Sequence, residues 1–296
     1  SVLRDADIAM YQAKRQGRGR YEMFEPSMRK RVHDDVELEN DLRQAVEKGE
    51  IHVVYQPMID LGSGRLVGME ALARWSHPQR GLVSPLTFIP VAEATGVIGR
   101  LGEFVLKTAC HELVRLRGLL GAQAPETVSV NLSRAQLRQA GFTAKLSELL
   151  YSAGLAPGAL MLEVTESLAA QDEGMQAILR EIRALGVSLS LDDFGTGYSS
   201  LSCLHELPVN QVKIDRSFVS QALTSNYHRV MIAATISMAR TLGLQTVAEG
   251  IETAEQAALM TELGCGKGQG YLYSRPLGPR DLEVWALAMP AAALRT

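Results

Sequence analysis

From residue 51 onward, short β-prone runs alternate with longer segments of helical periodicity, and this alternation constrains the fold more than any other feature. Eight runs have β-strand character: Ile51–Asp60, Leu66–Trp75, Thr127–Leu132, Leu160–Thr165, Val187–Asp192, Gln211–Ile214, Gln245–Glu249 and Gly268–Tyr273. Helical patterns fill most of the connections: 100–118, 143–153, 173–185, 226–242 and 253–263. Eight strands with mostly helical connections predict an α/β fold, a modified TIM (β/α)8 barrel, rather than an open sheet.

One connection is too short to be a parallel crossover. The first two runs are separated only by residues 61–65, which include Gly62 and Gly64. A turn of this length joins two antiparallel strands as a hairpin. We therefore expect a barrel with one antiparallel strand.

The first 35 residues differ from the rest of the chain. Apolar residues at helical spacing predict a first helix: Leu3, Ala6, Met10 and Ala13. A Gly-rich basic segment, Gln16–Arg20, would end it, before a strand-like run at Tyr21–Phe24. Basic clusters can bind nucleic acid, but this one is short and bordered by acids, which favours a solvated helix end. About 35 residues cannot bury a core alone.

The domain organisation follows from this difference. We predict that residues 1–35 are the tail of a neighbouring domain plus a linker, and that residues 36–296 form the barrel. A second helix with apolar residues from Val36 to Val46 would lead into it and end at Gly49. Because the chain starts at Ser1 without a Met, we expect a piece of a longer protein, whose missing part could carry membrane segments.

Composition excludes several classes of protein. Hydrophobic residues make up 46% and charged residues 21%, as in globular proteins rather than disordered, collagenous or disulfide-rich ones. The net charge of −3 provides no overall attraction to nucleic acid or to a membrane. No apolar run is long enough for a transmembrane helix. Three scattered cysteines, Cys110, Cys203 and Cys265, favour a reducing, cytoplasmic location.

Acidic residues gather where the strand-like runs end. Seven carboxylates occur there: Glu70, Glu163, Glu166, Asp192, Asp193, Glu249 and Glu252. Asn131, Lys213 and Gln269 occupy equivalent places. In a (β/α)8 barrel the carboxyl ends of the strands meet at one mouth, where active sites lie. Converging carboxylates repel one another unless cations neutralise them or their pKa values rise.

The types of residue at these positions indicate the chemistry. Oxygen ligands with an Asn amide favour Mg²⁺ or Mn²⁺, and no His or Cys cluster offers a zinc site. Adjacent Asp192 and Asp193 suit a pair of ions that share one carboxylate, the arrangement used to hydrolyse phosphodiesters. Lys213 could hold the attacking water or offset developing charge. The sequence therefore predicts a metal-dependent hydrolase.

Other motifs do not support competing functions. Asp193–Gly195 spells a kinase signature, but the catalytic loop and the glycine-rich phosphate loop of kinases are missing. Gly264–Gly268 lacks the spacing and the Ser/Thr of a nucleotide-binding P-loop. A lyase of the enolase type would also place acids at strand ends, but it does not explain adjacent aspartates.

These residues also resemble a known family. Glu70-Ala71-Leu72 stands within Met69–Pro78 and matches the name motif of the EAL-type cyclic-di-GMP phosphodiesterases. Further matching segments are Tyr55–Pro57, Phe88–Glu93, Asn131–Ser133, Glu163–Glu166, Asp192–Ser200, Lys213–Phe218, Glu249–Glu252 and Gly268–Tyr271. The resemblance covers about residues 36 to 290. The segment Ala6–Lys14, with Gly17, Arg18, Arg20 and Tyr21, resembles the C-terminal end of a GGDEF, diguanylate-cyclase-type domain, without its catalytic half.

The resemblance implies that the chain hydrolyses cyclic di-GMP to linear 5'-pGpG with two Mg²⁺ or Mn²⁺ ions, which lowers a bacterial second messenger. It implies these metal ligands: Glu70, Asn131, Glu163 and Asp192 for one ion, with Asp192 shared and Asp193 added for the other. Lys213 and Glu249 would be catalytic, along with Glu70; which of the first two is the general base stays open. The implied substrate-binding residues are Gln56, Leu72, Arg74, Asp215, Glu252 and Gln269. Glu166 would anchor the loop Phe194–Ser200.

The resemblance leaves one alternative and several expectations about partners. Some members of the family lack metal ligands and act as cyclic-di-GMP receptors or scaffolds without turnover; this chain has every ligand type the chemistry needs. Ca²⁺ should inhibit, because its longer and looser coordination misplaces the water. We expect a homodimer through the loop after Asp193, an upstream GGDEF domain and sensor in the parent protein, and no nucleic-acid polymer or membrane contact within this chain.

Overall fold

The chain folds into two compact units that are described separately below. The computed structural model describes residues 5–6, 9–10, 23–169, 173–195, 204–205 and 207–289. One unit comprises residues 1–51 and 75–101, and the larger one comprises residues 52–74 and 102–296. The candidate site residues from Gln56 to Gln269 all belong to the larger unit.

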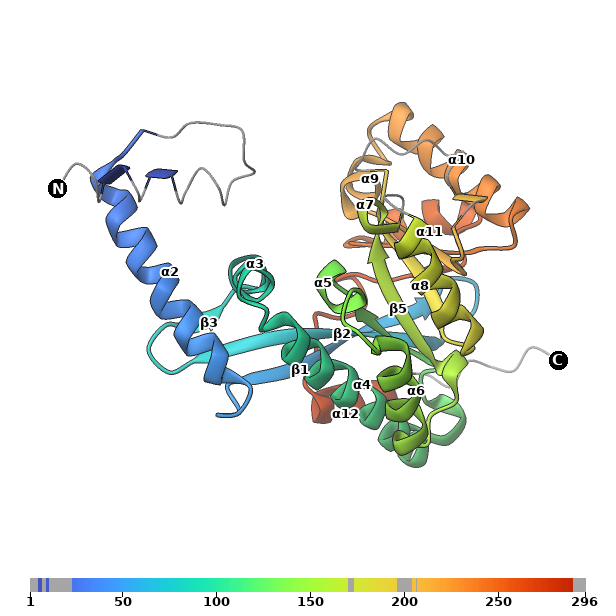
Figure 1. The fold of residues 1–296 in the computed structure, drawn as a ribbon. Coiled ribbons are helices and arrows are strands. Elements are labelled where there is room, and N and C mark those ends of the chain that lie inside the picture. The colour runs from blue at the N-terminus through green and yellow to red at the C-terminus, as the bar shows by residue number, and fades with distance from the viewer. Residues whose placement is uncertain are drawn as a thin grey trace. The chain divides into compact units, whose positions relative to one another are not determined.

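The larger unit is built on a closed barrel (Figure 1). Its strands are β1 (Ile51–Asp60), β2 (Leu66–His77), β4 (Thr127–Asn131), β5 (Leu160–Thr165), β6 (Ser188–Phe194), β7 (Gln211–Ile214), β8 (Gln245–Ala248) and β9 (Lys267–Gly268). They pair in the order β1-β9-β8-β7-β6-β5-β4-β2, and β1 also pairs with β2, which closes the ring. β1 is antiparallel to β9, whereas the pairs from β2 through β4 to β9 are parallel. The predicted barrel with one antiparallel strand is confirmed.

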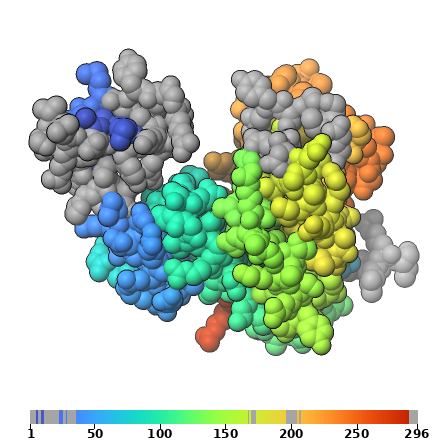
Figure 2. Space-filling view, viewed as in Figure 1, coloured from blue at the N-terminus to red at the C-terminus, as the bar shows by residue number. Residues whose placement is uncertain are grey.

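Helices cover the outside of this barrel. Those described are α4 (Ile98–Leu120), α5 (Arg134–Leu137), α6 (Phe142–Ala153), α7 (Glu166–Ala169), α8 (Glu173–Ala184), α9 (Arg216–Gln221), α10 (Asn226–Thr241), α11 (Ala254–Glu262) and α12 (Pro279–Ala288), with 3-10 turns at Gly121–Gln123 and Pro157–Ala159. α8 buries Met175, Leu179 and Ile182, one stripe at helical spacing. α6, in green, and α8, in yellow, lie side by side on the outer surface (Figure 2).

Local sequence signals explain where several of these elements end. The hairpin between β1 and β2 turns at Gly64, whose φ of 72° is in the left-handed region. α6 ends at Gly154, whose backbone N–H donates to the carbonyl of Leu150. The first five residues of β5 are all buried, as expected for a strand of a parallel barrel covered on both faces.

The structure also differs from the sequence prediction in places. The eighth run, expected from Gly268 to Tyr273, is a strand only at Lys267–Gly268, because the chain then turns and Tyr273 N–H donates to the Gly270 carbonyl. The helices α9 and α12 were not predicted; α9 has only 6 residues, too few to show a helical period.

The smaller unit contains α2 (Pro26–Ala45), β3 (Gly81–Val83) and α3 (Pro85–Thr95). Its core holds the end of β2, where Trp75 Nε1 donates to Glu50 at 3.0 Å and His77 Nε2 lies 3.0 Å from Asp41. α2 begins ten residues before the predicted second helix and runs across position 35, so the boundary between 35 and 36 stays a prediction. Most of the GGDEF-like segment lies outside the described residues.

The structure bears on membrane-spanning helices and on the state of the cysteines. In the parts of the chain that are described, no helix combines the length and the apolar character needed to cross a membrane. Cys110 and Cys265 are free and buried, and Cys203 lies outside the described residues.

Candidate active site

Lys213 lies at the centre of a ring of carboxylates at the carboxyl ends of the strands. Its side chain comes from β7 and is only 1% exposed. The ammonium Nζ is 2.5 Å from Glu249 Oε1 and 2.8 Å from Glu163 Oε2. It is also 3.2 Å from Asp192 Oδ1 and 3.4 Å from Glu70 Oε2. Four different strands or strand ends thus place their acids around one cation.

Glu70 connects this ring to both predicted amide residues. It is buried in the middle of β2. Asn131 Nδ2, at the end of β4, donates to Glu70 Oε1 at 2.8 Å, and Gln269 Nε2 donates to Glu70 Oε2 at 2.8 Å. The same Gln269 amide donates to Glu249 at 3.2 Å. Residues about 200 positions apart in the sequence therefore share one hydrogen-bond network.

A bulge in β6 presents two aspartates to this network. Leu191 pairs with Val212 and Phe194 pairs with Ile214, so Asp192 and Asp193 together stand opposite Lys213 alone. Among the described residues, Asp193 is the one non-glycine residue with a positive φ, 55°. Consecutive residues of a regular strand point to opposite faces. The extra residue and the left-handed backbone remove that alternation here.

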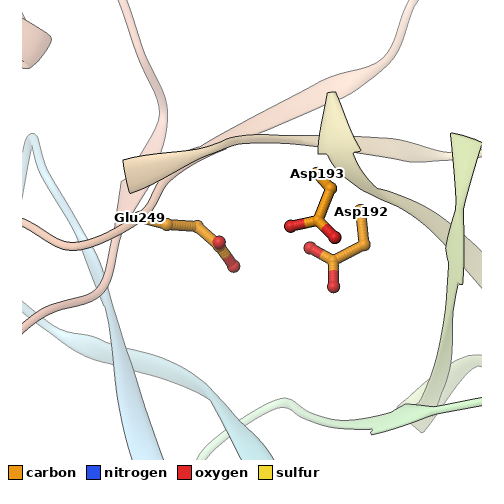
Figure 3. Close-up of side chains that lie close together, drawn as sticks. All are labelled: Asp192, Asp193 and Glu249. Carbon is orange, nitrogen blue, oxygen red and sulfur yellow. The ribbon is translucent and has the colours of Figure 1, made fainter. Parts of the chain in front are cut away.

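The carboxylates of the bulge and of Glu249 lie close enough to bind a common ion. One oxygen from each of Asp192, Asp193 and Glu249 falls within 4.8 Å of the others. Figure 3 shows the two aspartate carboxyl groups next to each other, with that of Glu249 opposite them. The left-handed conformation of a non-glycine residue costs about 1–3 kcal/mol, so the surrounding structure must stabilise it.

Burial and crowding shift the pKa values of these groups. Burial raises the pKa of Glu249 to about 7, against the attraction of Lys213. Burial and the neighbouring Glu70 raise the pKa of Glu163 well above its usual range. The pKa of Asp193 is also raised, mainly by burial and next by the charge of Asp192. The acids are thus more numerous than one lysine can neutralise.

In contrast to these acids, Lys213 and Glu70 have pKa values that are shifted in favour of their charged forms. Burial opposes the charged form of Lys213, but the surrounding carboxylates, Glu163 first and Glu249 next, raise its pKa well above the usual value. Burial also opposes ionisation of Glu70, yet Lys213 and the hydrogen bonds from Gln269 and Asn131 lower its pKa. The pair therefore carries opposite full charges at neutral pH.

The residues of this ring fit divalent cations that prefer oxygen ligands. Five carboxylates face one ammonium in the described residues: Glu70, Glu163, Asp192, Asp193 and Glu249. Glu163 Oε1 and Gln269 Oε1 are buried and accept no hydrogen bond from any described residue. Carboxylate and amide oxygens with excess negative charge are the donor set that Mg²⁺ and Mn²⁺ take.

A neutral polar layer lies directly beneath the ring. Gln211, two residues before Lys213, donates its side-chain N–H to Ser190 Oγ at 3.1 Å, and both residues are buried. Ser190 is the strand neighbour of Glu163. Sequence reasoning missed this layer, although the polar residues at alternate positions of β6 were a signal for it.

The remaining predicted residues occupy the rim with fewer contacts. Gln56 and Leu72 are half-buried on β1 and β2. Arg74 is also half-buried, and its Nη1 donates to the Ala73 carbonyl at 2.9 Å. Asp215 caps α9 by accepting the Ser217 N–H at 2.9 Å. Their assignment to substrate stays a prediction.

Two predicted acids lie apart from the network. The carboxylate of Glu252 is exposed and has no hydrogen bond or ion pair with the described residues; only its backbone N–H bonds, to Gln256. Glu166 is buried at the start of α7, and its Oε2 accepts no hydrogen bond there. Most of the loop that Glu166 was predicted to anchor lies outside the described residues.

The rim contains one pair that sequence reasoning did not single out. The guanidinium of Arg275 lies 4.3 Å from the centre of the Tyr271 ring, a cation–π contact. Tyr271 is 52% exposed and follows Gln269 by two residues. Burial lowers the pKa of Arg74, while Glu70 and Tyr271 act in the opposite direction.

Known proteins share this combination of fold and site. The chain is 43% identical over 282 residues to the bifunctional diguanylate cyclase/cyclic di-GMP phosphodiesterase MucR of Pseudomonas aeruginosa, covering 95% of this chain and 41% of MucR. It is 40% identical over 288 residues to the cyclic di-GMP phosphodiesterase NbdA of the same species, covering 97% and 36%. The chain thus spans about two fifths of the length of these curated relatives.

A solved structure and a family model agree with these relatives. The structure of the PaMucR phosphodiesterase in complex with c-di-GMP superposes with a TM-score of 0.78 at 42% identity, covering 83% of this chain and 99% of that one. The family model for the EAL domain matches residues 39–276, which include every strand of the barrel and each candidate site residue. The chain therefore belongs to the EAL domain family.

Proposed function

We propose that this chain is a metal-dependent phosphodiesterase that hydrolyses cyclic di-GMP to linear 5'-pGpG. The observation that carries the proposal is the bulge that sets Asp192 and Asp193 opposite Lys213, with Glu249 across from them. MucR and NbdA, each at least 40% identical to this chain, are named for cyclic di-GMP phosphodiesterase activity. The matching MucR structure is a c-di-GMP complex.

The carboxylate ring would hold two Mg²⁺ or Mn²⁺ ions. We assign Glu70, Asn131, Glu163 and Asp192 to one ion, and Asp192 and Asp193 to the other. When bound, such ions supply charge neutralisation and a more acidic water. One carboxylate oxygen of Glu249 lies within 4.8 Å of an oxygen of each aspartate, which places Glu249 beside the proposed second site.

Lys213 and Glu249 divide the proton chemistry between them in this proposal. A lysine ammonium has hydrogen-bond donors only, and this one already donates to surrounding carboxylates. Lys213 would therefore orient the attacking water and offset negative charge as it develops on the phosphate. Glu249 has acceptor oxygens at the same place, and we assign it the proton that leaves the water.

The rim would bind the dinucleotide itself. The half-buried guanidinium of Arg74 offers a planar donor fork that matches a phosphate oxygen pair. Gln56, Leu72, Asp215, Glu252 and Gln269 complete the proposed substrate-binding set. Gln269 also bonds Glu70 and Glu249, so it would link substrate position to the ring.

Product analysis tests the proposal directly. The protein is incubated with cyclic di-GMP and Mn²⁺ or Mg²⁺, and pGpG is measured by chromatography. Glu70→Ala should abolish turnover because it removes a metal ligand, whereas Glu126→Ala, at an exposed acid just before β4, should keep it. Binding of the nucleotide without product would instead support a receptor. Full activity with Ca²⁺ as the sole divalent ion would contradict the expected inhibition by this ion.

Several properties of the whole protein extend the proposal. We infer a cytoplasmic location, where the nucleotide is made, and a homodimer through the loop after Asp193. The parent protein would carry an upstream GGDEF domain and a sensor, and would lower the second messenger in bacterial signalling. Sedimentation of the chain with and without nucleotide would test the dimer; a monomer at all concentrations would exclude it.

A further inference from the structure

The backbone that carries Asp193 rests against an aromatic ring from the next strand–helix unit. A Cβ built on Gly195 would lie 3.0 Å from both Cε2 and Cζ of Phe218. Gly195 has a φ of 99°, and Asp193, two residues earlier, has a φ of 55°. The ring therefore fills the space next to a backbone segment in which two residues adopt left-handed conformations.

Phe218 is itself held on several sides. It is partly buried and packs against the core cluster that includes Ile214, Val219 and Ile251. On another side the ring of His228 meets it edge-on, with centroids 5.4 Å apart. His228 Nδ1 lies 2.8 Å from Ser225 Oγ, which fixes its orientation. An aromatic ring packed in this way cannot move away without losing those contacts.

The segment that carries Phe218 is also fixed relative to Lys213. Asp215 Oδ1 accepts hydrogen bonds from the N–H and the hydroxyl of Ser217, at 2.9 and 2.5 Å, and so caps α9 directly after β7. Phe218 lies in the first turn of this helix. Lys213 and the ring therefore belong to one rigid strand–cap–helix unit, and that unit faces the bulge of β6.

We propose that Phe218 is a positioning residue for the second metal site. By supporting the backbone at Gly195, its ring holds Asp193 in the left-handed conformation and keeps both aspartate carboxylates on the side of Lys213. Without the ring, Asp193 can relax to an extended conformation, in which its side chain turns away from that of Asp192. The inference rests on the proposed metal-dependent function of this site.

The test compares metal binding with turnover. Phe218→Leu, Phe218→Ala and Gly195→Ala are prepared with Phe142→Leu, a matched loss of a buried ring from α6. Mn²⁺ binding without nucleotide is measured by calorimetry and electron paramagnetic resonance, and turnover is measured against Mn²⁺ concentration. In the three test variants one ion should stay tightly bound, and the second should bind about 10- to 100-fold more weakly. kcat should fall accordingly, whereas the KM for cyclic di-GMP changes by less than about twofold.

Each outcome decides the inference. Two Mn²⁺ ions bound with wild-type affinity by Phe218→Leu and Gly195→Ala would overturn it, as would an equal loss of the second ion in Phe142→Leu. If Phe218→Ala does not fold, the other two variants decide. If the wild type binds two ions but produces no pGpG, the proposed function fails while the binding data still judge Phe218. A wild type that binds fewer than two ions would overturn the inference.

Discussion

Two lysines inside the same barrel have opposite environments. Lys213, on β7, is fully buried among four carboxylates, and its pKa is raised. Lys267, the first residue of β9, donates to the neutral amide of Gln245 at 2.8 Å, and burial lowers its pKa despite Glu126 and Asp60. Gln245 begins β8, whereas Glu249 follows its end.

The difference shows how the barrel separates charge along its strands. The carboxyl ends gather more acids than one lysine can balance, and the other lysine contacts an uncharged side chain. Burial alone would lower the pKa of both ammonium groups. The surrounding carboxylates therefore distinguish Lys213, which lies in a site suited to cations, from the half-buried Lys267. The following experiments test that distinction.

The largest effect is expected from Lys213→Met. The substitution removes the ammonium charge that four acids contact and leaves an uncharged side chain of similar length. Turnover should fall by about 100-fold or more, because a donor that stabilises developing charge is lost. In the presence of a metal chelator, the free energy of unfolding at neutral pH should fall by about 3–5 kcal/mol, the usual cost of leaving buried charges unpaired. Product formation and denaturant unfolding measure the two effects; wild-type turnover would remove Lys213 from the catalytic set.

A more selective change is Glu163→Gln. Burial and the neighbouring Glu70 raise the pKa of Glu163 well above its usual range, so the metal-free site opposes its charge, and an amide has the same shape as the carboxyl group. The thermal midpoint in chelator should therefore stay close to that of the wild type. Mn²⁺ at 100 times its wild-type Kd should add about 2.7 kcal/mol to the wild type and much less to the variant. An equal Mn²⁺-induced shift in both proteins would show that Glu163 is not a ligand.

The pH dependence of the metal-free protein is expected to be smaller. In the folded state Glu249 keeps its proton up to a pKa of about 7, whereas in the unfolded chain it releases it near 4.5. The folded state thus binds more protons between these values, so stability should fall as pH rises from 5 to 7.5. Thermal midpoints in chelator would record this fall, and Mg²⁺ or Glu249→Gln should reduce it. A midpoint that rises over this interval would contradict the raised pKa.

The smallest effect is expected from Lys267→Met. Its ammonium bonds an amide at the opposite end of β8 from Glu249, and removing a half-buried charge with a lowered pKa costs little. The free energy of unfolding should change by less than about 0.5 kcal/mol, as for ordinary surface substitutions, and turnover should stay at the wild-type level. A loss of turnover comparable to that of Lys213→Met would end the distinction between the two lysines.

Much of the fold could be predicted because local sequence carries it. The bounds of β1, β5 and β7 agree with the predicted runs to the residue, since alternating and continuous apolar patterns mark buried strands. The antiparallel β1 followed from a connection too short to cross the barrel. Short elements such as α9 escaped prediction because six residues show no period. Most of the eighth run is a turn, in which Tyr273 N–H bonds the Gly270 carbonyl and Leu272 N–H bonds the distant Ile251 carbonyl.

Some features of the candidate site also follow from the sequence, and others depend on the tertiary structure. The sequence by itself determined which chemical groups gather at one mouth, because parallel strands bring their carboxyl ends together whatever their detailed packing. Tertiary structure alone decided that Asp192 and Asp193 face the same side. Regular alternation would have separated them, and only the offset between β6 and β7, with Phe218 against Gly195, permits the left-handed backbone at Asp193. It also decided how deeply Lys213 is buried and which four carboxylates contact it, since burial and charge at a position depend on strands far apart in the chain.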